Sequence, residues 1–531
     1  MLSDAIKSFQ KSSLKETQTV ETSVRSLIGD GGDSLIGDGG DALQWIRTGS
    51  GWRQVEVAQG EDAGRINGDS GKEAAQTTRR MTGVAPHQMH GQCYGIEAER
   101  NAWSAPVSTY SSDVTARPGY DTMSASEFED DPAVLTAKVK YLARLVRSAK
   151  RCVVYAGAGL STAAGIDDYA TRRRGSDAPT LRSPLCAQPT HAHRVLVAMQ
   201  RASLLHRFVG QNHDGLAQKA GMPQHAVNEI HGALHAPDNP IVPMSGTLRE
   251  DLLVDVAACE ATSDLVLAVG TSLAGMNADR LVHTANARAT RAAVVHPSSS
   301  TATADGNGRR RHDAASLGSV IIGLQRTVVD GESTLRIFGT CDDVFRQLAE
   351  ALEIGDLVPP ERPPGTYFCP SVLARHGAVD VDIGDAAAGH VGAATEKDLS
   401  SSGGDDRYRL RGLAYDAMGR RRNAKSMGVH GAPTFDLDLR DGARVAIPRG
   451  MHAGAIGEVD GTDREGHPRC RFELRLKPNA PLKVPMQMLL GTWWLQAASG
   501  ASVEYLPVVN VPQESDRTDA AEELRTLCSH Y

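Results

Sequence analysis

The sequence has 531 residues and eight cysteines, but no two cysteines are close enough to form a CxxC pair. This scatter argues against a zinc knuckle or a disulfide framework and favours reduced thiols inside the cell. No stretch of about 18 apolar residues occurs, so no membrane-spanning helix is predicted and no membrane partner is expected. The segment Met1–Lys15 has no apolar core of a signal peptide. We therefore expect an intracellular protein of the nucleus or the cytosol.

Aromatic residues are scarce, at 5% of the chain, and the formal net charge is −7. An acidic chain of this kind is not a dedicated nucleic-acid-binding protein. Glycine is abundant, with 53 residues, whereas hydrophobic residues still make up 40% of the chain. The composition therefore predicts a globular core beside long segments that have no packed structure.

The order of these segments can be drawn along the chain. The first part is rich in Gly, Ser, Asp and Thr and repeats SLIGDGGD exactly at 26–33 and 34–41. Such a segment cannot bury enough apolar surface to order itself, so we expect no secondary structure there. The expected divisions are a disordered, low-complexity region at 1–125, an α/β domain at 130–354, a linker at 355–407, a small β-barrel-like domain at 408–511 and a tail at 512–531.

Short apolar runs alternate with amphipathic stretches between residues 130 and 354. This alternation predicts a doubly wound, Rossmann-like parallel sheet with helices on both faces. Order begins at Asp131-Pro132, where an N-cap precedes a proline at the first helical position. The expected strands are 152–155, 208–209, 265–269, 293–295 and 320–322. The expected helices are 131–150, 194–205, 252–258 and 344–352.

A glycine-rich loop, Gly157-Ala158-Gly159-Leu160-Ser161, follows the first of these strands directly. Glycine permits a tight turn and lets the backbone approach a pyrophosphate closely. A helix expected after the loop would point its N–H groups at the phosphates. The same residues also occur in ordinary turns, but the position between a strand and a helix favours a dinucleotide site.

Longer blocks are specific enough to resemble a family. GAGLSTAAGIDDYA at 157–170 resembles the sirtuin pattern GAG-x-S-x-x-x-G-I-P-D-F-R. QNHDGL at 211–216 resembles its QN-x-DGL, NEIHG at 228–232 its ELHG, and GTSL at 270–273 its GTSL. Residues 320–348 resemble the segment that closes the cofactor site near the end of the domain. The blocks appear in family order, and the chain is most similar to the nuclear class of sirtuins.

The resemblance implies an NAD-dependent lysine deacylase that forms nicotinamide, free lysine and O-acyl-ADP-ribose. It assigns His231 as the base that takes a proton from a ribose hydroxyl, a task that suits a neutral imidazole. Asn212 and Asp214 would hold the ribose and the nicotinamide amide. Val242 and Met244 match the strand that lines the acyl-lysine tunnel. The residues that it assigns to NAD binding are Gly157, Ala158, Gly159, Ser161, Thr162, Gly165, Ile166, Asp168, Tyr169, Gln211, Asn212, Gly270, Thr271, Ser272, Gln325 and Cys341.

The chain departs from the family pattern at several positions. The family's proline, arginine, isoleucine and asparagine are replaced by Asp167, Ala170, His213 and Gly323. Arg172 or Arg173 is a candidate to supply the missing charge.

The family's four zinc cysteines are also missing. Between His231 and Gly270 the only cysteine is Cys259, so we expect no bound zinc and no metal ligands. The turn Asp238-Asn239-Pro240 would then have to close the small lobe.

Three interpretations of function stay open. The first is the deacylase, acting on an acylated protein of the histone type. The second is an NAD-consuming ADP-ribosyltransferase or NAD hydrolase. The third is a catalytically silent module that binds NAD or ADP-ribose.

The C-terminal domain adds a further expectation. Residues 450–459 and 471–473 resemble a small KOW-type barrel, which would bind RNA or protein. Trp493-Trp494 is either a core pair or part of a binding face.

Overall fold

The computed structural model describes the chain in separate ranges. These are residues 43–48, 51–56, 81, 83–112, 123–166, 184–243, 246–295, 316–361, 409–412, 415–416, 418–421, 435–474, 483–499 and 502–511. The tandem repeat, most of the predicted linker and the C-terminal tail lie outside them.

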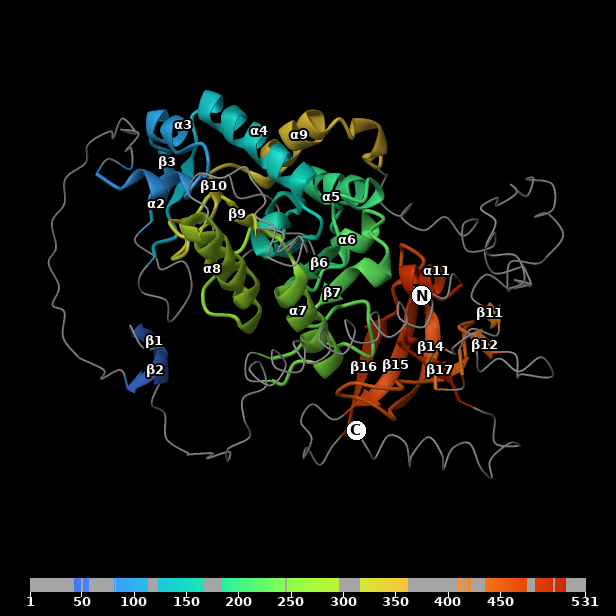
Figure 1. The fold of residues 1–531 in the computed structure, drawn as a ribbon. Helices are drawn as coiled ribbons and strands as arrows, with labels where there is room; N and C mark the ends of the chain where they lie inside the picture. The colour runs from blue at the N-terminus through green and yellow to red at the C-terminus, as the bar shows by residue number, and fades with distance from the viewer. Residues whose placement is uncertain are drawn as a thin grey trace, which may run out of the picture.

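A parallel sheet of six strands forms the centre of the larger domain, in the order β10-β9-β8-β5-β6-β7 (Figure 1). Its strands are β5 (Cys152–Ala156), β6 (Arg207–Gly210), β7 (Val227–Glu229), β8 (Leu265–Val269), β9 (Gly318–Ile322) and β10 (Leu335–Ile337). Strands β5, β8 and β9 are buried at every position, as expected for strands that are covered on both faces. The doubly wound fold predicted from the sequence is confirmed.

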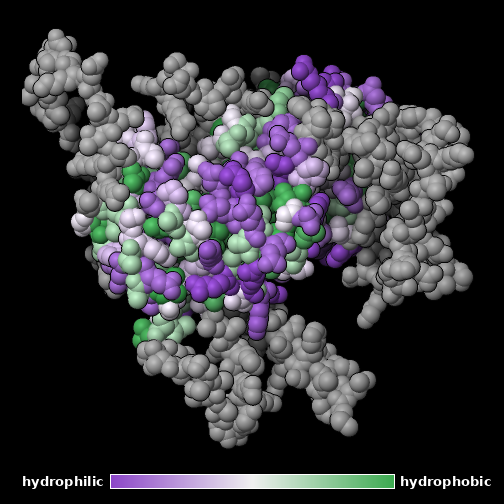
Figure 2. Space-filling view, turned by 90° about the horizontal axis from the view of Figure 1, so that it is seen from above, coloured by the Kyte–Doolittle hydropathy of each residue, from purple (hydrophilic) through white to green (hydrophobic). Residues whose placement is uncertain are grey.

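Helices cover both faces of this sheet. Alternate residues of β5 belong to different cores, because side chains point to opposite faces of a strand. Val154 packs in the core with α4 (Pro132–Ser148), α5 (His191–Arg201) and α9 (Cys341–Leu352). Tyr155 packs in the core with α7 (Glu250–Thr262) and α8 (Arg280–Val295). Figure 2, which views the molecule from the side of α4 and α9, shows mainly hydrophilic residues with small apolar patches, so this helical layer faces solvent.

The start of α4 and four of the six central strands were predicted, whereas β7, β10 and α8 were not, and one predicted strand is wrong. Asp131 caps α4 by accepting a hydrogen bond from the Ala133 amide at 3.0 Å, as expected. The strand predicted at 293–295 is wrong, because these residues form the last turn of α8. Val294 is 74% exposed there, so this apolar run does not enter the core.

The prediction of no secondary structure up to residue 125 is wrong for part of this region. The structure contains β1 (Leu43–Thr48) paired with β2 (Gly51–Glu56), then α2 (Pro86–His90), α3 (Glu97–Ala102), and β3 (Val107–Tyr110) paired with β4 (Glu127–Glu129). Cys93 is fully buried, and its amide donates to the Thr334 carbonyl at 2.7 Å. Elements this short show no clear periodicity, and the segment around Cys93 is ordered in contact with the α/β domain.

The C-terminal domain is an antiparallel sheet in the order β16-β15-β14-β13-β17, consistent with a small barrel. Its strands are β13 (Arg444–Ala446), β14 (Ile456–Thr462), β15 (Pro468–Leu474), β16 (Val484–Leu489) and β17 (Val509–Asn510), beside a pair of β11 (Arg409–Gly412) and β12 (Phe435–Asp438). Trp493 and Trp494 lie on α11 (Thr492–Ser499) and are buried in the core of this domain, which is called the barrel below. The interpretation as a core pair is therefore confirmed. Within the described residues no helix is long and apolar enough to cross a membrane.

The barrel packs directly on the loop that follows β7, at residues 232–240 (Figure 1). Ala233 and Ala236 of this loop belong to the barrel's hydrophobic core. Asp238 is fully buried and accepts from Arg249 Nη1 at 2.9 Å and from Arg449 Nε of the barrel at 2.8 Å. The turn at 238–240 therefore does not close the small lobe alone, because the C-terminal domain packs against it.

Candidate active site

The glycine-rich loop lies at the carboxyl end of β5, against the loop that follows β8. Gly157 donates to the Val269 carbonyl at 2.9 Å, and Gly159 donates to the Gly270 carbonyl at 2.8 Å. A Cβ built on Gly157 would lie 2.7 Å from the Gly270 oxygen, and Gly270 itself has a φ of +59°. Glycine is therefore required at these positions because the two backbones touch.

The α-helix expected directly after this loop is absent from the described residues. Two 3₁₀ turns, η1 (Ala158–Leu160) and η2 (Thr162–Ala164), follow instead, and the description stops at Ile166. Gly165 has a left-handed φ of +81°, which ends η2.

A hydrogen-bonded network connects the glycine-rich loop to the residues after β6. Asn212 Nδ2 donates to the Ser161 hydroxyl and to the Gly157 carbonyl, each at 3.0 Å. Ser161 Oγ donates to Asp214 Oδ2 at 2.7 Å, and Asp214 Oδ1 accepts from the amide of Leu216 at 2.9 Å. Asp214 therefore organises both loops and starts the short helix α6 (Leu216–Lys219).

The loop after β8 joins the same edge of the sheet. Gln211 Nε2 donates to Thr271 Oγ1 at 2.9 Å. The carboxyl ends of neighbouring strands in a doubly wound sheet form the crevice in which ligands bind. Gln211, Thr271 and the partly exposed Ser272 therefore supply polar groups to one shared crevice.

His231 follows β7 at this edge and is partly exposed. Its carbonyl accepts from the amide of Val242 at 3.0 Å, so the predicted substrate residue lies beside the predicted base. His213 donates from Nδ1 to the Gly232 carbonyl at 2.8 Å. Gly232 has a φ of +90°, and a Cβ there would lie 2.1 Å from the Pro240 oxygen. The position of His231 therefore depends on a tightly packed loop.

The structure also places three further residues that were predicted to bind NAD, Thr162, Cys341 and Gln325. Thr162 Oγ1 donates back to the Gly159 carbonyl at 3.2 Å. Cys341 begins α9 with its sulfur 3.7 Å from the same carbonyl oxygen, and burial raises the pKa of its thiol to about 12. Gln325 forms a β-bridge with Glu127 of the N-terminal segment. Asp168, Tyr169 and Met244 lie outside the described residues, as do Asp167, Ala170, Arg172 and Arg173.

Comparison with known proteins finds similarity to one family over part of the chain. A model of the Sir2 family matches residues 179–238. The NAD-dependent protein deacetylase SRT1 of Arabidopsis thaliana is 36% identical over 115 residues, which are 20% of this chain and 24% of SRT1. The NAD-dependent protein deacetylase sirtuin-7 of Homo sapiens is 39% identical over 115 residues, 20% of this chain and 28% of sirtuin-7. Over this segment the chain is therefore similar to the Sir2, or sirtuin, family.

The match to these sirtuins is partial. The chain spans about a quarter of the length of the curated relatives just named. A solved structure described as "Sir2-p53 peptide-NAD+" is 20% identical, with 41% of this chain and 100% of that chain covered and a TM-score of 0.32.

Two departures from the sirtuin pattern have a structural setting. A Cβ at Gly323 would meet nothing nearer than 3.9 Å, so space does not exclude the asparagine of the family. Nothing in the structure explains that replacement. Cys259, the one cysteine between His231 and Gly270, is buried among the core residues of α7, and among the described residues it belongs to no group of metal-ligand side chains.

Glu229, to which the sequence analysis gave no role, lies directly under the site. It is buried and lines a small pocket with Asn212 and Asp214. Burial raises its carboxyl pKa from 4.5 to about 8, opposed by a hydrogen bond from Gln218 and assisted by the charge of Asp214. The sequence signal was its place within the NEIHG block, two residues before His231.

The raised pKa of Glu229 predicts a dependence of stability on pH. The folded state binds this proton up to about pH 8, whereas the unfolded state releases it near 4.5. Stability should therefore fall as the pH rises through this window, by about 1.4 kcal/mol per pH unit for one proton. Glu229→Gln should remove that part of the slope in urea unfolding measured from pH 5.5 to 8. The exposed Glu250→Gln should leave it unchanged; equal slopes in all three proteins would contradict the assignment.

Proposed function

We propose that this chain is an NAD-dependent protein lysine deacylase. The observation that carries the proposal is the joining of the sirtuin blocks at one edge of the sheet. Ser161, Asn212 and Asp214 form a continuous hydrogen-bonded network there, and His231 follows the neighbouring strand β7.

The residues present fit NAD as the second substrate. Two loops with glycines at their contact points leave backbone and hydroxyl groups at the carboxyl edge of the sheet, where dinucleotides bind in this class of fold. Gly157–Ser161 and Gly270–Ser272 would hold the phosphates and the ribose. NAD supplies a cleavable nicotinamide–ribose bond and an ADP-ribose acceptor for the acyl group.

The chain's own residues then have separate tasks. Asn212 would orient the ribose and the nicotinamide amide, and its position is fixed by Ser161 and the Gly157 carbonyl. Asp214 keeps Ser161 in place from below. The acyl oxygen of the substrate lysine amide would attack the ribose carbon from which nicotinamide departs. His231 would then accept a proton from a ribose hydroxyl, so that this hydroxyl attacks the acyl carbon and the lysine amine is released. Val242 would line the path of the acyl-lysine, because its backbone is bonded to that of His231.

One incubation tests the proposal against its two rivals. The full-length protein is mixed with NAD and an acylated histone-type peptide, and all products are measured by mass spectrometry. We expect free lysine, nicotinamide and O-acyl-ADP-ribose in equal amounts. Release of ADP-ribose, or its transfer to protein without peptide turnover, would instead identify the transferase or hydrolase. No release of nicotinamide would identify a silent binding module.

The substrate class, the compartment and the partner of the barrel are proposed as well. An acylated histone is the proposed natural substrate class, with the nucleus or the cytosol as the compartment. The barrel is the proposed site for an RNA or protein partner, although one of its sides is already used by the loop at 232–240.

A further inference from the structure

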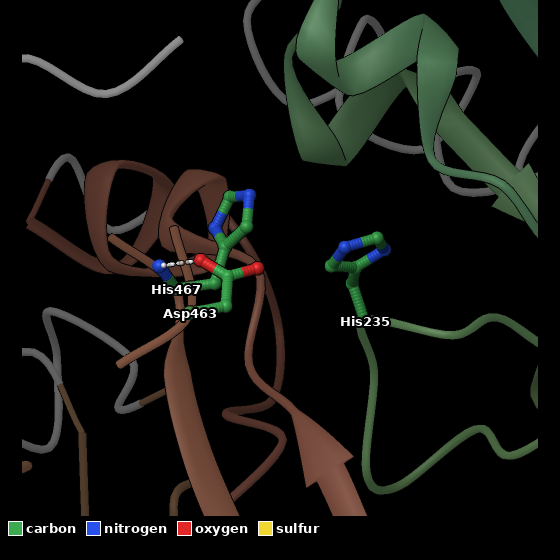
Figure 3. A group of neighbouring side chains, drawn as sticks. All are labelled: His235, Asp463 and His467. Carbon is green, nitrogen blue, oxygen red and sulfur yellow. Dashed lines mark hydrogen bonds between the residues drawn. The ribbon is translucent and has the colours of Figure 1, made fainter. Parts of the chain in front are cut away.

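Three side chains that are distant in sequence meet where the barrel contacts the α/β domain. His235 comes from the loop at 232–240, whereas Asp463 and His467 come from the turn between β14 and β15. Their ligand atoms all lie within 4.8 Å of one another. Figure 3 shows the His235 ring facing the two barrel residues across the domain boundary.

His235 is a buried histidine whose ring nitrogens lack a recorded hydrogen bond within the described part of the chain. It is 1% exposed, and neither of its ring nitrogens has a hydrogen-bond partner among the described residues. Its ring centre lies 5.1 Å from that of His467 and 5.0 Å from that of Trp493. Burying an imidazole without a partner incurs the full desolvation cost of its polar atoms. A group that binds one of these nitrogens would remove that cost.

Asp463 holds the turn with one carboxylate oxygen, and no hydrogen bond from a described residue is recorded for the other. Its Oδ1 accepts from the amides of Glu465 and His467, each at 2.9 Å, which fixes the turn. Figure 3 shows the other carboxylate oxygen on the side of His235. The structural role of Asp463 in the turn therefore leaves a negatively charged oxygen directed at the cluster.

His467 is fully buried and has a polar neighbour on each side of its ring. Nδ1 lies 3.2 Å from Thr492 Oγ1, and Nε2 lies 3.5 Å from Glu465 Oε2. Glu465 in turn pairs with Lys219 of α6 at 2.9 Å. Metal-binding histidines usually bond through their second nitrogen to a hydroxyl or a carboxylate. The Thr492 amide also donates to Nδ1 at 3.2 Å, so Nε2 is the nitrogen left for an ion, with the Thr492 hydroxyl beside Nδ1.

We propose that His235, Asp463 and His467 bind one divalent transition-metal ion, zinc in the first instance. This ion would hold the barrel against the α/β domain. Two imidazoles and a carboxylate are a ligand set that zinc accepts, with a fourth position for water. Ligand atoms around a tetrahedral zinc ion are about 3.3 Å apart, so the side chains need to approach by about 1.5 Å or less.

This proposal is independent of the deacylase activity and revises one expectation. The missing cysteines led to the prediction of a protein without zinc, and that prediction would be wrong if this site is filled. The prediction considered only the cysteines between His231 and Gly270, whereas Asp463 and His467 come from another domain.

The test uses the full-length protein, stripped with a chelator and titrated with ZnCl₂ by calorimetry and with Co²⁺ by absorption spectroscopy. We expect one ion per chain with micromolar or tighter affinity and a Co²⁺ spectrum of low coordination number. Asp463→Asn keeps an oxygen acceptor for the two turn amides but loses the charged ligand. Since outer-sphere changes alone weaken metal binding 10–100-fold, it should weaken Zn²⁺ binding by at least about tenfold. His235→Ala should abolish binding.

The exposed His225 provides the matched control. His225→Ala should bind zinc like the wild type, and circular dichroism should show all variants folded. Binding of less than a tenth of an ion per chain would overturn the proposal and leave a metal-free polar cluster. Wild-type zinc affinity in both Asp463→Asn and His235→Ala would also overturn it, because the ion would then lie elsewhere.

Discussion

His231→Ala is expected to lower the rate of lysine deacylation by about 10²–10⁴, which is the usual contribution of a positioned general base. The affinity for NAD should change little. The phosphates and the ribose would be held by the loops at Gly157–Ser161 and Gly270–Ser272, which contact each other through their backbones. Steady-state kinetics with an acylated peptide, together with NAD binding measured by calorimetry, separate the two effects.

The control for this experiment follows from the structure. His235 is unsuitable as a control because it is buried against the C-terminal domain. His213 is unsuitable too, because its ring bonds the Gly232 carbonyl next to His231. The exposed His225 is suitable, and His225→Ala should keep wild-type kinetics. Wild-type deacylation by His231→Ala would make the silent binding module the better hypothesis.

Asp238→Ala is expected to lower the free energy of unfolding by about 2–4 kcal/mol. Breaking a buried ion pair costs about 3–5 kcal/mol, and the lower figure allows for arginines that water can partly reach. The side chain of Asp238 is 0% exposed, whereas those of Arg249 and Arg449 are 15% and 21% exposed. Urea unfolding followed by tryptophan fluorescence measures the change, since Trp493 lies beside this domain boundary.

Asp251 is a closely matched control, because it pairs with the same two arginines. It lies 2.7 Å from Arg249 Nε and 3.0 Å from Arg449 Nη1, but its side chain is 45% exposed. An exposed pair contributes about 0–1 kcal/mol, so Asp251→Ala should cost no more than that. Equal losses in the two variants would show that burial of Asp238 does not decide the strength of this contact.

The sequence predicted the parts of the fold that have a clear local period or cap. The five-residue apolar run of β8 lay exactly where expected, and Asp131-Pro132 marked the start of α4. The GAG, QN and NEIHG blocks were recognisable as family motifs because each depends on residues close together in the chain. These blocks carry the resemblance to sirtuins and the candidate residues His231, Asn212 and Asp214.

Where the local signal was short or ambiguous, the prediction failed. The apolar run at 293–295 fits a strand or a helix equally well, and only its continuation from Arg280 decides for α8. The segment at 81–112 has a loop-like composition, yet Cys93 is buried against residues more than 200 positions later. No local pattern encodes such a contact.

The sequence by itself determined the doubly wound sheet, the order of the site loops and the absence of the zinc cysteines. The tertiary structure decided what stands at the small lobe instead. In the sequence Asp238 and His235 look like ordinary loop residues. In the structure Asp238 pairs with Arg449 of the barrel, and His235 lies beside Asp463 and His467 of the barrel. The physical reason is that periodicity and capping act over a few residues, whereas burial and ion pairing depend on which distant surfaces come together.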